Sequence, residues 1–314
     1  MCVKPITFRP LYKTRVWGGR NLQSRYARPL PDEQPYGESW ELVDREDDQS
    51  IVTSQNHQGK SLNQLWTQHR AEIFGENLPN SERFPILIKI LDCQDDLSIQ
   101  VHPPATLAPS LNGEPKTEMW YLAGAENHAS LYIGFKKGVT RAEFQQSIHD
   151  GTVADYVHCI SPQEGESIFI PSGRLHAIGG GNLIFEIQQN SDTTYRVFDW
   201  NRVGLDGQPR ELHIEESLAS IDFDDFEPVM DTPDGCTLAT CAYFQTDKHN
   251  LAIDETISNP DSETFSVLAI VHGQLTSPTG IHNPGDFLLL PKGCPPLLAT
   301  EATTILQITL PKAS

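Results

Sequence analysis

The clearest structural signal in this chain of 314 residues is the segment Gly165-Glu166-Ser167-Ile168-Phe169-Ile170-Pro171-Ser172-Gly173-Arg174-Leu175-His176. It has the spacing G-x5-P-x-G-x2-H. Glycine and proline favour sharp turns, and here they bound a short apolar run. The segment therefore predicts a strand over 167–170 with a tight turn at each end, and His176 emerges from the second turn.

A second polar stretch lies upstream, at residues 97–103, where polar and apolar side chains alternate. Side chains of a strand alternate between its two faces, so Ser98, Gln100 and His102 are expected to share one face. Glu118 follows sixteen residues after His102, and Lys116 and Glu118 are expected to share a face in the same way. The sequence thus places several potential metal ligands on short strands.

The two segments together resemble the paired motifs of cupins, which are small β-barrels of the jelly-roll type. The resemblance implies a metal site formed by Gln100, His102, Glu118 and His176. Two imidazoles, a carboxylate and an amide oxygen suit Zn²⁺ or a related divalent ion. Gln100 stands where a first histidine is usual, and its neutral oxygen is a weaker donor.

The rest of the chain favours a mainly β fold, a jelly-roll sandwich with few helices, because short apolar runs are bounded by glycine and proline. Strands are predicted at 84–91, 119–122, 130–135, 167–170, 183–187, 265–271 and 287–290. Helical periodicity is confined to 61–74, to 140–159 with a break at Gly151, and to 211–221.

A degenerate copy of the second motif occurs near the C-terminus. The segment 285–293 repeats the spacing G-x5-P-x-G, but Cys294 and two prolines follow where a histidine would be expected. This internal repeat predicts a second barrel that has lost its metal site. His272 and Cys294 are therefore interpreted as structural. We expect a bicupin with a catalytic domain at 1–235 and a degenerate cupin-like domain at 236–314.

Composition excludes several classes of protein. Lys and Arg number 23 and Asp and Glu 42, so the net charge is −19. Such a charge disfavours nucleic acid and anionic membrane as partners. No stretch approaches the length of an apolar membrane span, and the start lacks the apolar core of a signal peptide. The six cysteines form no Cys-x-x-Cys pair, which predicts reduced thiols in a cytoplasmic protein.

Longer motifs resemble those of type I mannose-6-phosphate isomerases in their short bacterial form. They are Trp17-Gly18-Gly19, Gly37-Glu38-Ser39-Trp40-Glu41, the run 84–92 and the run 186–200, which reads EIQQNSDTTYRVFDW. The resemblance extends over the whole chain. It implies a Zn²⁺-dependent interconversion of mannose 6-phosphate and fructose 6-phosphate through an enediolate.

The resemblance also implies roles for individual residues. Lys89 and Ser98 would contact the substrate phosphate, and Arg196 would be catalytic, together with Lys116 and Glu186. Lys89 is the lone charge of an apolar run and needs an anionic partner if buried. Glu186 is either a proton-transfer residue or an ion-pair partner that orients Lys116 or Arg196.

Several alternatives stay open at this stage. The general base could be Lys116, Glu186 or a metal-bound water. A cupin iron dioxygenase and a non-catalytic sugar-binding cupin compete with the isomerase, although Gln100 and the basic residues disfavour the former and Arg196 the latter. Trp17 and Glu38 match family motifs without a clear role. The sequence does not decide between a monomer and a small homo-oligomer.

Overall fold

The computed structural model describes residues 3–312, and its internal contacts divide the chain into two compact units. The inner unit, so named only for its place in the sequence, consists of residues 12–39 and 89–231. The outer unit consists of residues 40–88 together with the described parts of 1–11 and 232–314. None of the helices within residues 3–312 has the length and apolar character needed to cross a membrane.

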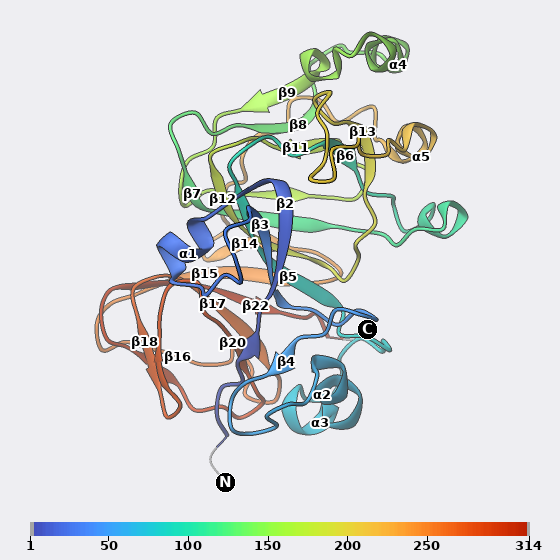
Figure 1. Ribbon diagram of the computed structural model, residues 1–314. Helices are drawn as coiled ribbons and strands as arrows, with labels where there is room; N and C mark the ends of the chain where they lie inside the picture. The colour runs from blue at the N-terminus through green and yellow to red at the C-terminus, as the bar shows by residue number, and fades with distance from the viewer. Residues whose placement is uncertain (1–2, 313–314) are drawn as a thin grey trace. The chain divides into compact units, whose positions relative to one another are not determined.

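Two antiparallel sheets form the inner unit (Figure 1). The six-stranded sheet has the order β10 (Ser167–Ile170), β7 (Glu118–Ala125), β12 (Asn182–Gln189), β5 (Ile86–Cys93), β3 (Tyr36–Leu42) and β2 (Leu11–Gly19). The five-stranded sheet has the order β13 (Tyr195–Phe198), β6 (Ile99–Val101), β11 (His176–Ile178), β8 (Leu131–Phe135) and β9 (Val157–Ile160).

The five-stranded sheet has one apolar outer face and one face toward the other sheet. Ile99 and Val101 of β6 pack in a core cluster with Phe144 of helix α4 (Arg141–Asp150), and Leu218 of α5 (Ile214–Ser220) packs against the same cluster. A second cluster joins side chains of both sheets, among them Trp120 and Ile133. The two sheets thus enclose an interior, as expected for a jelly roll.

The outer unit carries two further sheets. One has the order β14 (Thr237–Thr240), β15 (Gln245–Leu251), β22 (Thr303–Thr309), β17 (Ser266–His272) and β20 (Phe287–Leu290). The other has the order β16 (Thr256–Ile257), β21 (Leu297–Ala299), β18 (Leu275–Ser277) and β19 (Gly280–His282). Leucine and isoleucine dominate the core between these strands, and Cys294 is buried there. The core between these strands is therefore aliphatic, while Trp66, Phe74, Phe84 and Phe265 form a separate buried aromatic cluster in the same unit.

The remaining elements are short. They are β1 (Phe8–Arg9), which pairs with β4 (Ile51–Val52), the helices α1 (Asn21–Tyr26), α2 (Leu62–Gln68) and α3 (Arg70–Ile73), and the 3-10 turns η1 (Ala108–Leu111) and η2 (Val153–Tyr156). The mainly β, cupin-like architecture is confirmed. The internal contacts group residues 40–88 with the C-terminal segment. The predicted domains, 1–235 and 236–314, are each one continuous segment, and this division stays a prediction.

One predicted helix was partly wrong. The span 140–159 begins as expected, because Thr140 and Glu143 form a capping box and Gly151 ends α4 in the left-handed region at φ +71°. The chain then makes η2 and enters strand β9, where Val157 pairs with Phe135 of β8. Pairing with a neighbouring strand and burial of Val157 outweigh the weak helical periodicity there.

Candidate active site

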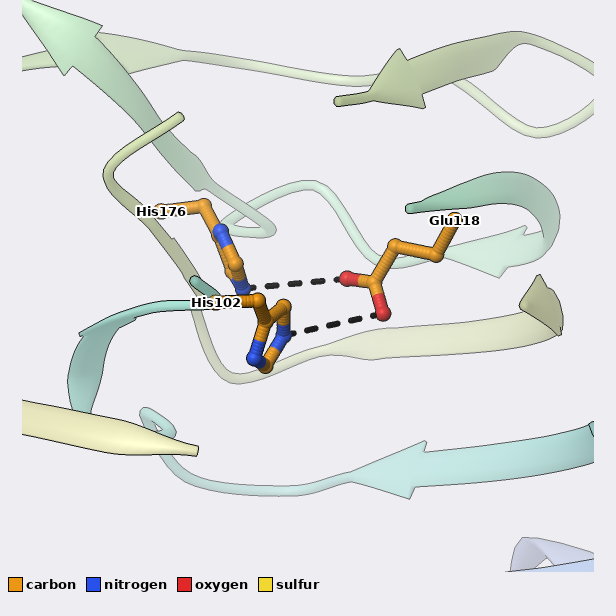
Figure 2. Close-up of side chains that lie close together, drawn as sticks. All are labelled: His102, Glu118 and His176. Atoms are coloured by element: carbon orange, nitrogen blue, oxygen red, sulfur yellow. Dashed lines mark ion pairs between the residues drawn. The ribbon is translucent and has the colours of Figure 1, made fainter. Parts of the chain in front are cut away.

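Three potential metal ligands converge inside the inner unit. His102 follows β6, Glu118 begins β7 and His176 begins β11, and each is only 1% exposed. Nε2 of His102 lies 3.7 Å from Oε2 of Glu118, and Nε2 of His176 lies 3.7 Å from Oε1 of the same carboxylate. Figure 2 shows both imidazoles facing the Glu118 carboxylate from one side.

Backbone carbonyls orient both imidazole rings. Nδ1 of His102 donates to the Thr193 carbonyl at 2.8 Å, and Nδ1 of His176 donates to the Arg174 carbonyl at 2.9 Å. This arrangement fixes the tautomer and leaves each Nε2 lone pair directed at Glu118. Burial lowers the pKa of His102 well below its ordinary value and that of His176 to about 4, so both rings are neutral near pH 7.

The three residues fit a divalent metal. Nε2 of His102 is buried without a hydrogen-bond partner among the described residues. A gap of 3.7 Å is too long for a hydrogen bond. Ligand atoms on a tetrahedral zinc are about 3.4 Å apart, given metal–ligand bonds near 2.1 Å. Within residues 3–312, this is the one cluster of three His, Cys, Asp or Glu residues close enough to share an ion.

Gln100 lies at the same place. It is paired in register with His176 on β11 and with Arg196 on β13. Its Nε2 lies 3.4 Å from Nε2 of His176, and its Oε1 accepts from the Ser98 hydroxyl at 3.1 Å. A half-turn of the carboxamide exchanges these two atoms, so the amide oxygen can also face the imidazoles while Ser98 accepts from the amide nitrogen.

Lys116 lies beside the ligand cluster. Its Nζ is 2.7 Å from Oε2 of Glu118 and 3.6 Å from Oε1 of Glu186, and the residue is 5% exposed. Burial alone would lower the pKa of Lys116, but the two carboxylates raise it above its ordinary value. Burial and the nearby Glu186 charge raise the pKa of Glu118 to about 7, against the opposing effect of Lys116.

Lys89 has the anionic partners that its sequence context requires. Its Nζ lies 3.3 Å from Oε1 of Glu186 and 3.8 Å from Oε2 of Glu38. Glu186 is thus held between two ammonium groups. Burial would raise the pKa of Glu186, but Lys116 and Lys89 lower it below its ordinary value, so its carboxylate is ionised. An ion pair with Lys116, one of the two roles left open for Glu186, is present, and it does not exclude proton transfer.

Arg196 extends from β13 toward β6. Its Nε donates to the Ser98 hydroxyl at 3.3 Å and its Nη1 to the Glu211 carbonyl at 2.7 Å. Among the described residues it forms no ion pair with a carboxylate. Ser98 thus connects the guanidinium to Gln100, whereas its predicted contact with phosphate stays a prediction.

These side chains border one cavity of about 600 Å³. Its charged lining comprises five basic and five acidic side chains, which are Arg15, Lys89, Lys116, Arg196, Arg210, Glu38, Glu118, Glu186, Asp192 and Asp206. The protein groups alone therefore balance, and a bound divalent cation would make the cavity positive. His102 does not border the cavity, whereas the other eight predicted site residues do.

Sequence reasoning missed several lining residues. Trp17 and Glu38 match family motifs to which the sequence assigns no role, and no sequence pattern points to Arg15 or Arg210. The strand order of the six-stranded sheet brings Arg15, Trp17 and Glu38 to the cavity, and the Asp199 carboxylate anchors Arg210 in the loop after β13. Local patterns encode neither arrangement.

Comparisons with known proteins identify the family of this chain. Residues 6–129 match the model of the phosphomannose isomerase type I catalytic domain. The mannose-6-phosphate isomerase ManA of Bacillus subtilis is 34% identical over 310 residues, covering 93% of this chain and 95% of the relative. A crystal structure of the mannose 6-phosphate isomerase from Bacillus subtilis has a TM-score of 0.87 at 28% identity, covering 98% of this chain and 100% of that one.

A more distant solved structure shares the fold. It is a mannose 6-phosphate isomerase bound with zinc and yttrium, with a TM-score of 0.74 at 16% identity, covering 98% of this chain and 99% of that chain. Fold and site together define a cupin enzyme with a buried His-Glu-His cluster of the metal-binding type. The chain belongs to the type I phosphomannose isomerase family.

Proposed function

We propose that this protein interconverts mannose 6-phosphate and fructose 6-phosphate with one Zn²⁺ per chain, through an enediolate. The observation that carries the proposal is the placement of Lys116, Glu186 and Arg196 around one cavity that also borders the ligands Glu118 and His176. An iron dioxygenase has no use for three such groups, and a binding module needs no proton-transfer residue.

Gln100, His102, Glu118 and His176 would hold the metal. The donor set is neutral or anionic and buried, and both histidines direct Nε2 toward Glu118. When bound, the ion supplies Lewis-acid stabilisation of negative charge on the sugar oxygens O1 and O2. The zinc in a solved relative of the same fold supports this choice of metal.

Glu186 is our candidate for the base. Two ammonium groups keep its carboxylate ionised, and it faces the cavity. In the aldose it accepts the proton of C2, and the electron pair forms the C1–C2 double bond while O1 becomes negative. The O2 proton then passes to O1, and return of a proton to C1 completes the ketose.

Lys116 and Arg196 are the candidate electrophilic groups. Lys116 is charged and can donate toward an oxygen near the metal ligands without leaving Glu118. Arg196 forms no ion pair with a carboxylate among the described residues, so its guanidinium can pair with an incoming anion. A cation fixed beside a developing oxyanion lowers the barrier because it needs no reorganisation.

The phosphate would be held at the basic side of the cavity, with Lys89 and Ser98 as contacts. Lys89 is shared by two carboxylates, so a phosphate dianion must compete with Glu38 and Glu186 for its ammonium. We further propose that the enzyme acts in the cytoplasm, as a monomer or small homo-oligomer.

The decisive experiment is an isomerisation assay of purified, zinc-loaded protein with mannose 6-phosphate. Fructose 6-phosphate should form, and product made in D₂O should carry deuterium at C1, which a direct hydride transfer from C2 would not give. Absence of turnover from protein that contains its metal would refute the proposed function.

A further inference from the structure

A row of alternating charges crosses the six-stranded sheet of the inner unit. Neighbouring strands in the order β2, β3, β5, β12 and β7 contribute Arg15, Glu38, Lys89, Glu186 and Glu118. Lys116, two residues before Glu118, lies between the last two carboxylates. Each charge in this cross-strand row thus has an opposite charge next to it, from the strand β2 to the metal ligand.

The first half of the row is closely connected. Nε of Arg15 donates to Oε1 of Glu38 at 2.6 Å, and Oε2 of Glu38 lies 3.8 Å from Nζ of Lys89. The Glu38 side chain is 11% exposed and that of Lys89 is 6% exposed, so water screens this interaction weakly. The Glu38 carboxylate therefore attracts the Lys89 ammonium with little screening by solvent.

The Lys89 ammonium lies between two carboxylates. Its Nζ is 3.3 Å from Glu186 and 3.8 Å from Glu38, so the two carboxylates draw it in different directions. If Glu38 lost its charge, Lys89 would pair more closely with Glu186. That carboxylate would then be drawn from Lys116, which now lies 3.6 Å away. The position of the candidate base therefore depends on a residue two strands away from it.

A close approach of two strands supports the first pair. Gly37 precedes Glu38 on β3, and a Cβ atom at position 37 would lie 2.5 Å from Cζ3 of Trp17 and 2.7 Å from Cβ of Arg15. Only glycine leaves room for these two side chains to lie against β3. This packing explains why glycine precedes glutamate there, and it holds the Arg15 stem where its guanidinium reaches Glu38.

We infer that Glu38 is a positioning residue of the isomerase: it shares Lys89 with Glu186, limits how closely Lys89 draws the Glu186 carboxylate, and so keeps Glu186 in place for proton transfer. The inference rests on the proposed function. Glu38 acts through Lys89 rather than on the reacting atoms, so its removal should lower kcat more than it changes KM.

The test compares Glu38→Gln, Lys89→Met and the double variant in the isomerisation assay, all with zinc bound. We expect Glu38→Gln to lower kcat about tenfold with KM changed less than about twofold, as for a misplaced proton-transfer group. Glu38→Asp, which keeps the charge, should recover part of the rate. The double variant should be no slower than Lys89→Met, because the two residues act as one unit.

Asp247→Asn is the matched control. Asp247 is 7% exposed, accepts hydrogen bonds from Thr237 and Gln245, and is neither a candidate metal ligand nor part of the cavity lining. Its kcat should match the wild type, and zinc affinity from a competing chromophoric chelator should be unchanged in both Glu38→Gln and the control. Wild-type kcat in Glu38→Gln, a rise in KM alone or additive losses in the double variant would overturn the inference. An inactive zinc-loaded wild type would instead overturn the proposed function.

Discussion

The backbone amide of Gly173 donates a hydrogen bond of 2.9 Å to the carbonyl of His102. Gly173 belongs to the turn that delivers His176, so this bond ties together the two segments that carry candidate metal ligands, although they are far apart in the sequence. Gly173 has φ +94°, a conformation that side chains rarely adopt. The turn thus sets the spacing between two imidazoles as well as the direction of one.

Gly173→Ala should weaken both folding and metal binding. The strained φ costs about 1 kcal/mol of unfolding free energy, and the new Cβ would lie 3.3 Å from the Ser220 carbonyl oxygen. Gly138→Ala is the control, because Gly138 has a similar φ of +87° with nothing within 4 Å of a Cβ. Denaturant unfolding and zinc titration should show similar stability losses but weaker zinc binding only for Gly173→Ala. Equal zinc affinities would contradict the structural link.

Removal of the metal should abolish activity and lower the thermal midpoint. A ligand that binds only the folded state adds about 4 kcal/mol when its concentration is 1,000 times the Kd, so chelation should produce a clear shift. Mass spectrometry should find one zinc per chain, since residues 3–312 contain one cluster of three potential ligands. Glu118→Gln should show no zinc-dependent shift. Two ions per chain, or a shift that survives this substitution, would refute a single site at Glu118.

The strands and turns that carry the candidate metal ligands could be predicted from sequence because their patterns are local, whereas the ligand set itself was implied by the resemblance to cupin motifs. Ser98, Gln100 and His102 alternate with Ile99 and Val101, and the structure places the latter pair in the outer core cluster. The residues Pro171 and Gly173 similarly predict the turn that precedes His176. Period-two alternation and turn chemistry are properties of a few consecutive residues, so they can be seen without the fold.

The remaining features depend on contacts that no local pattern encodes. The need of Lys89 for an anion was evident from its apolar surroundings, but Glu38 and Glu186 become its partners only through the strand order β3, β5, β12. The bridge between Ile6 and Leu289 likewise joins the ends of the chain within the outer unit. Such pairings between distant parts of the chain group the described parts of residues 1–11 with those of residues 232–314 in one unit.

Arg196→Ala should lower kcat by about 10²–10³-fold, because the guanidinium stabilises negative charge that develops during the reaction. Its hydrogen bond to Ser98 would also be lost, so zinc content must be measured in the same preparation. Arg141→Ala, which removes an arginine stacked 4.9 Å from the Phe223 ring centroid, should leave kcat unchanged. A rise in KM with unchanged kcat would show that Arg196 only binds substrate.

Zinc binding should release a proton in a pH-dependent way. In the metal-free protein, burial and the Glu186 charge raise the pKa of Glu118 to about 7, so this carboxyl is largely protonated at pH 6 and ionised at pH 8. The histidines are already neutral in that range, since the pKa of His176 is about 4 and that of His102 is also strongly lowered. Binding should therefore release about one proton at pH 6 and close to none at pH 8, and affinity should fall as the pH drops below 7.

Calorimetric titrations in buffers of different ionisation enthalpy measure this number of released protons directly. Release of two or more protons at pH 6 would mean that the imidazoles are charged before zinc binds.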